Sequence, residues 1–162
     1  MDAFVQWLQA TPVSLWINQS TWIWPLCETL HFIGLSLLLG ITGFFDLRLM
    51  GFFRRVSVAA VRELMPLALV GFAINLITGV VFLTGLPGQY AHNPLWWFKV
   101  GFIMLAGLNA LVYETTLSAK VLALEPGADT PPSVKMIGLV SLVAWLAVLY
   151  CGRMLPFLGD AF

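Results

Sequence analysis

Four stretches of this sequence are each long and apolar enough to cross a lipid bilayer, which leaves few folds open to the chain. We expect these spans at residues 22–46, 64–85, 95–117 and 134–154, because about 20 apolar residues suffice to cross the hydrocarbon core as a helix. Only 10% of the 162 residues are charged, whereas 60% are hydrophobic. A soluble domain carries about a quarter charged residues. The chain therefore belongs in a membrane.

A segment of mixed polarity precedes the first span. Within residues 2–19, Phe4 and Trp7 recur at helical spacing before Pro12 interrupts the run. Apolar and tryptophan side chains on one face are typical of an amphipathic helix lying in the membrane interface. The predicted fold is all-α: a four-helix transmembrane bundle with an N-terminal interfacial amphipathic helix, in a single integral membrane domain over residues 1–162.

Basic residues are distributed unequally between the two ends of the expected bundle. Lys99 and Arg153 belong to the end that carries both termini. The opposite end has six basic residues: Arg48, Arg54, Arg55, Arg62, Lys120 and Lys135. Basic residues are retained on the cytoplasmic side. We therefore expect a multi-pass protein of the bacterial inner (cytoplasmic) membrane with both termini periplasmic.

Charge and the N-terminal residues also limit the partners. The net charge is zero, so the lipid bilayer is an expected partner and nucleic acid is not. The N-terminal residues lack the basic region and the cleavage site of a secretory signal, so we expect no cleaved leader. No nucleophile–base motif or phosphate loop is present, which argues against hydrolytic and kinase-type chemistry.

The first span contains an acid and a histidine in apolar surroundings. Glu28 and His31 are three residues apart, so they share one face of a helix. An ionisable residue inside a span is costly and marks a functional site by default. The sequence has two histidines, and the second, His92, lies in the loop at the same end of the bundle. These residues are the first candidates for a site.

A b-type haem is the cofactor that we expect at this end. His31 would be one axial ligand and His92 the second, with Met104 as the alternative to His92. Lys99 and Arg153 would hold the anionic propionates. Such a haem would transfer electrons near the periplasmic face, to or from a quinone or a periplasmic electron carrier.

Two details qualify the haem site. His31 lies about 10 Å below Trp24 at helical rise, whereas His92 lies near the surface, so the loop would have to fold inward for both to bind one haem. Glu28 would orient His31 or tune its basicity, as carboxylates beside metal-binding histidines do.

A copper or zinc ion is the alternative cofactor, in a protein for metal transport or homeostasis. Glu28, His31 and His92 could form one mononuclear site, because imidazole and carboxylate suit zinc, copper or iron. Glu28-x-x-His31 is also half of the pattern of di-iron bundles, but the other half is missing. A structural alternative pairs Glu28 with Lys99 or Arg153 and leaves His31 hydrogen-bonded nearby. A further alternative is a non-catalytic subunit of a larger membrane complex.

Cysteines and the remaining acids have simpler explanations. Cys27 and Cys151 lie near the same end on spans expected to be neighbours, where they could form a disulfide or be small buried hydrophobes. Neither belongs to a C-x-x-C motif. Asp46 and Glu114, near the opposite end, are interpreted as solvated or paired charges.

The pattern Trp24-Pro25-x-x-Glu28-x-x-His31-x-x-Gly34, followed by Asp46-Leu47-Arg48 and Gly51, resembles a family of functionally uncharacterised four-span membrane proteins from proteobacteria. The likeness covers most of the chain. More remotely, a histidine near one end of a small bundle resembles the copper-resistance D proteins and the small b-type cytochromes. Cytochromes of the b561 type use two haems and four histidines. With two histidines, the resemblance implies one haem at one face of the membrane.

Overall fold

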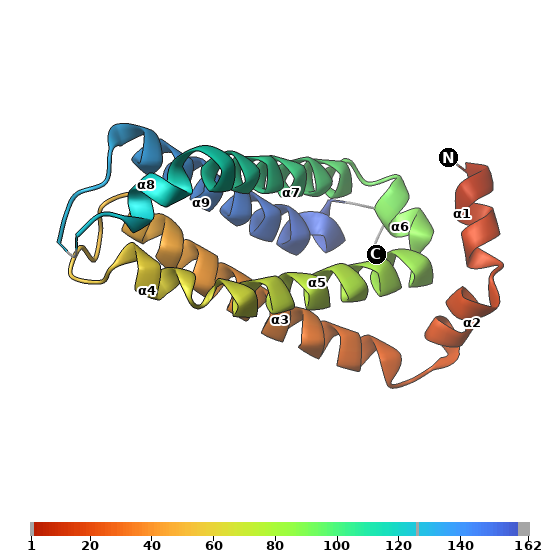
Figure 1. The fold of residues 1–162 in the computed structure, drawn as a ribbon. Helices are drawn as coiled ribbons and strands as arrows, with labels where there is room; N and C mark the ends of the chain where they lie inside the picture. The colour runs from red at the N-terminus through yellow and green to blue at the C-terminus, as the bar shows by residue number, and fades with distance from the viewer. Residues whose placement is uncertain (1, 126, 159–162) are drawn as a thin grey trace.

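The computed structural model describes residues 2–125 and 127–158, and within them the fold is helical without strands (Figure 1). Four helices in this described part are long and apolar enough to cross a membrane. They are α3 (Ile23–Leu49), α5 (Met65–Gly85), α7 (Pro94–Val112) and α9 (Pro132–Met154). This confirms the predicted all-α fold with four long apolar helices, and the chain is a multi-pass membrane protein.

Short helices connect and extend the long ones. The α4 helix (Val58–Arg62) precedes α5, and α6 (Pro87–Ala91) lies between α5 and α7. Helix α7 continues through a π-helical turn, η1 (Tyr113–Leu117), into α8 (Ser118–Leu122). A 3₁₀ turn, η2 (Leu155–Phe157), follows α9.

The N-terminal segment forms two short helices instead of the one that we predicted. Helix α1 (Asp2–Gln9) ends before Pro12, and α2 (Pro12–Gln19) starts there with Thr11 as its cap, whose Oγ1 accepts the Ser14 N–H at 3.3 Å. Proline at a first helical position lacks only an N–H that would be unpaired anyway. Helix α1 packs on α6 and α2 packs on α5, so the segment lies across one end of the bundle (Figure 1).

The long helices pack in the spatial order α5, α3, α9, α7. Small residues allow the two closest approaches of α3. A Cβ added at Gly71 of α5 would lie 2.6 Å from the Gly34 carbonyl oxygen of α3. A Cβ added at Gly138 of α9 would lie 2.7 Å from the Asp46 carbonyl oxygen. Close backbone approach at small residues is the usual way in which membrane helices associate.

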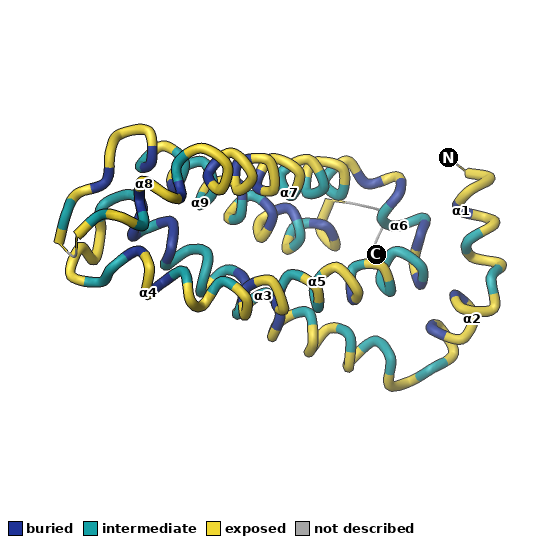
Figure 2. The backbone as a smooth tube through the Cα atoms, in the orientation of Figure 1, coloured by how far each residue is buried: buried dark blue, intermediate teal, exposed yellow. Residues whose placement is uncertain are grey.

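Burial is uneven along the bundle. Exposed residues cover the outer faces of the long helices (Figure 2), as expected for helices whose outer faces contact lipid. The main cluster of buried residues lies at the end where α3 finishes and includes Phe45, Leu49, Tyr113 and Val134. We call this end the Arg48 end, and the opposite end, with α1, α2 and α6, the His31 end. The connections packed around the Arg48 end supply much of this buried cluster.

Candidate functional site

His31 is held by a residue on the neighbouring span, Thr78. The His31 Nδ1 atom lies 2.7 Å from Thr78 Oγ1. The Thr78 hydroxyl in turn donates to carbonyl oxygens of its own helix, at 2.8 Å to Ile74 and 3.2 Å to Asn75. Thr78 is only 3% exposed. The His31 ring is therefore fixed by a buried contact between α3 and α5.

These contacts select one tautomer of His31. The single hydroxyl hydrogen of Thr78 points to carbonyl oxygens, which only accept, so Thr78 Oγ1 must accept a hydrogen from the ring. The three contacts are satisfied together only when Nδ1 carries a hydrogen. In the neutral ring the lone pair is then on Nε2, and within residues 2–125 and 127–158 that atom has no hydrogen bond. Nε2 is the atom free to bind a ligand.

Aromatic rings line His31 on the side of α5. The His31 and Phe82 ring centroids are 5.4 Å apart at an interplanar angle of 56°. Phe82 also stacks on Trp24, with centroids 5.4 Å apart and planes 8° apart. The imidazole thus lies against a flat aromatic wall, which suits a large planar ligand better than a hydrated ion.

Lys99 of α7 is the basic residue whose charge acts on the His31 ring. The Lys99 ammonium lies within electrostatic range of the His31 ring, and a Cβ at Gly152 of α9 would lie 3.3 Å from its Nζ atom. The side chain is partly buried, and no carboxylate pairs with it among the residues that the structure describes. A cation in a span without a counter-charge indicates a place for an anionic group.

His92 makes its hydrogen bonds with residues other than His31. Its Nε2 atom pairs with Asp2 Oδ1 at 3.0 Å and its Nδ1 atom lies 3.2 Å from the Gly88 carbonyl oxygen. The structure therefore uses His92 to join α6 to α1, and does not bring it to His31.

The other predicted residues are exposed or make their contacts with groups other than His31. Met104 is 70% exposed on α7, and the Arg153 guanidinium lies 5.2 Å from the centre of the Phe157 ring. Glu28 is exposed, and its predicted role of orienting His31 is taken by Thr78. The Glu28 carboxylate instead acts on Tyr90 of α6, where burial first and this carboxylate second raise the pKa of the phenol.

Potential metal ligands do not converge in the part of the chain that the structure describes. Across the described ranges, 2–125 and 127–158, no group of three His, Cys, Asp or Glu side chains is placed to hold a metal ion. The three-ligand site predicted from Glu28, His31 and His92 is thus not assembled. Cys27 and Cys151 are both free thiols, and Cys151 is buried whereas Cys27 is half-buried. The predicted alternative of a small buried side chain therefore describes Cys151.

A second polar cluster, at the Arg48 end, was missed by the sequence analysis. Asp46 is 3% exposed and Arg48 is 1% exposed, whereas the sequence predicts a solvated or paired charge for Asp46 and a basic residue of the cytoplasmic end for Arg48. Arg48 donates from Nε to the Val56 carbonyl oxygen at 2.6 Å and from Nη2 to that of Ala128 at 3.4 Å. It therefore joins two connections far apart in sequence. Thr130 supports the same junction by donating to the Leu49 carbonyl oxygen at 2.6 Å.

No family model matches the chain, and neither a curated protein nor a solved structure does so. The resemblance to four-span proteobacterial proteins thus stays a prediction.

Proposed function

We propose that this membrane protein binds one redox cofactor, a b-type haem, with His31 as the axial ligand at the His31 end of the bundle. The observation that carries the proposal is the hydrogen bond between His31 Nδ1 and Thr78 Oγ1. Metal-binding histidines almost always donate their other ring N–H to an oxygen, which fixes the tautomer and raises the basicity of the ligating nitrogen. An ionisable residue inside a span is costly and marks a functional site by default.

The residues around His31 fit this group. The stacked pair of Trp24 and Phe82 offers a flat apolar wall, and Lys99 offers a positive charge for a propionate. The haem, when bound, supplies one-electron chemistry. The chain itself binds through His31, orients that ring through Thr78, and places a counter-charge through Lys99.

Of the two histidines, only His31 keeps a ring nitrogen without a hydrogen bond within residues 2–125 and 127–158. His92 is engaged with Asp2 and Met104 is 70% exposed, so the second ligand that we predicted from sequence is not in position. A copper or zinc ion would likewise have His31 as its one protein ligand here, which is too few for a stable site of either metal. One protein ligand is enough to hold a haem but not a bare ion, so haem is the favoured cofactor.

The location and partners belong to the same proposal. The excess of basic residues at the Arg48 end supports an inner-membrane protein with the His31 end at the periplasmic face. A haem at that face would exchange electrons with a quinone in the bilayer or with a periplasmic electron carrier. One haem near one face does not connect the two sides of the membrane.

Purification of the full chain in mild detergent from cells supplied with a haem precursor tests the proposal. The expected result is a haem absorbance spectrum that sharpens on reduction and is lost in His31→Ala. His92→Ala is the matched control, because it removes the other histidine and should keep the spectrum. Loss of haem in His92→Ala, with retention in His31→Ala, would show that the ligand is His92 and not His31.

A further inference from the structure

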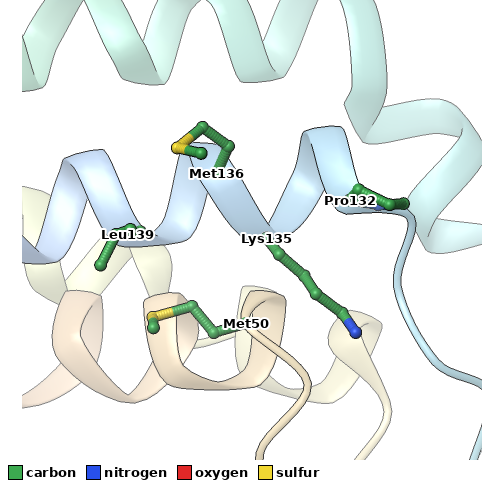
Figure 3. A pocket seen from close by; sticks show the side chains of 5 residues that line it. All are labelled: Met50, Pro132, Lys135, Met136 and Leu139. Carbon is green, nitrogen blue, oxygen red and sulfur yellow. The ribbon is translucent and has the colours of Figure 1, made fainter.

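A groove of about 300 Å³ lies at the Arg48 end, between the end of α3 and the first two turns of α9. Five residues line it: Met50, Pro132, Lys135, Met136 and Leu139 (Figure 3). The four that belong to α9 follow the spacing i, i+3, i+4 and i+7, so they form one face of that helix. Met50 stands opposite them, beyond the end of α3. The groove is separate from the His31 site.

The lining changes from charged to apolar along α9. Lys135 lies one turn inside the helix, and Leu139 lies one further turn away, about 6 Å deeper at helical rise. Met136 is 58% exposed and Leu139 is 41% exposed, so this part of the groove opens outward from a membrane-spanning helix. What surrounds a spanning helix at that depth is the hydrocarbon of the bilayer.

Positive charge is in excess at the entrance. Lys135 Nζ lies 2.7 Å from Asp129 Oδ2, and Arg54 Nη2 lies 3.2 Å from the same oxygen. Two cations thus share one carboxylate, which leaves one positive charge uncompensated among these three groups. The hydrogen bond from Lys135, together with the charges of Arg54 and Lys135, holds the pKa of the Asp129 carboxyl below its ordinary value.

We infer that this groove binds an anionic phospholipid, with its phosphate at Lys135 and Arg54 and one acyl chain against Met50, Met136 and Leu139. The uncompensated positive charge favours an anionic headgroup over a zwitterionic one. Methionine side chains are flexible and polarizable, so they adapt to a mobile chain. The inference does not depend on the function proposed for His31.

Native mass spectrometry of the full chain in detergent, titrated with phosphatidylglycerol and with phosphatidylcholine of identical acyl chains, tests the inference. We expect tighter binding of phosphatidylglycerol. Lys135→Gln should weaken it about fivefold, the effect of one basic residue near a lipid headgroup. Lys120→Gln is the matched control, since it removes the same charge at the same end of the bundle outside the groove.

A second variant separates groove binding from general attraction of charge. Leu139→Trp fills the apolar part and leaves Lys135, Arg54 and Asp129 in place, so it should weaken binding of phosphatidylglycerol while the protein stays folded. Equal binding of the two lipids would overturn the inference. Equal effects of Lys135→Gln and Lys120→Gln would do the same, as would wild-type lipid binding by Leu139→Trp.

Discussion

Replacing Thr78 with valine tests how firmly the neighbouring span holds His31. Valine keeps the branched shape of threonine but removes the hydroxyl that accepts from His31 Nδ1 at 2.7 Å. Hydrogen bonds between helices in a bilayer average only about 0.6 kcal/mol. Here the N–H of the half-buried His31 ring faces the buried Thr78 side chain and would lose its acceptor, which costs about 1–3 kcal/mol. We therefore expect a loss of about 1–2 kcal/mol in the free energy of unfolding.

Thermal unfolding of the purified chain in detergent measures this loss. For a chain of this size, about 1–2 kcal/mol corresponds to a fall in Tm of roughly 2–8 °C. Thr84→Val is the matched control, because the Thr84 hydroxyl on the same helix also donates to the carbonyl one turn back, Val80, at 2.8 Å. In haem-loaded protein, Thr78→Val should also lower haem affinity about 10- to 100-fold. Equal stability and equal haem retention in the two variants would refute the reasoning about the His31 tautomer.

Three further predictions concern the packing and the Arg48 end. Gly71→Ala should cost about 1–3 kcal/mol by overpacking, because the new Cβ would meet the Gly34 backbone. Gly79→Ala, where a Cβ meets nothing within 4 Å, should change the free energy of unfolding by less than about 0.5 kcal/mol; equal effects on Tm would contradict this packing. Arg48→Met should cost about 1.5–3 kcal/mol and speed proteolysis of the two connections that Arg48 joins, and unchanged proteolysis would argue against that role. The lowered pKa of Asp129 means that its contribution to stability is present above the ordinary pKa of 3.8 and is lost as the pH falls through the lowered value. A Tm titration should therefore show an acid-side decrease that is smaller in Asp129→Asn, and identical curves would contradict it.

The positions of the long helices followed from the sequence because the length of an apolar run is a local property. A bilayer demands helices of that length whatever they pack against. The break at Pro12 was also visible, but whether it divides one helix into two depends on the cap at Thr11, which the spacing of apolar residues does not reveal. End positions shifted where connections continue a helix, as α3 continues to Leu49.

His31 could be predicted as a candidate because a histidine in an apolar span is conspicuous by itself. Its partner could not. Thr78 also makes the bond to its own helix that threonines in helices commonly make, so its sequence context resembles that of Thr84. Only the packing of α3 on α5 distinguishes the two.

The partner of His92 and the burial of Arg48 depend on contacts between distant segments. Asp2 lies 90 residues before His92, and no local pattern connects them. Arg48 follows an apolar span directly and has the sequence context of an interface cation. Its burial depends on the connection that contains Ala128, 80 residues away. Such contacts between distant segments are tertiary properties, which no local pattern in the sequence reveals.

We propose that His31, oriented by Thr78, binds one haem. The most direct test is the visible spectrum of the purified protein, oxidised and then reduced with dithionite, in wild type, His31→Ala and His92→Ala. We expect the bands of a single b-type haem in the wild type and in His92→Ala, and their loss in His31→Ala. A featureless spectrum in haem-supplied wild-type protein, or bands that persist in His31→Ala, would contradict this proposal.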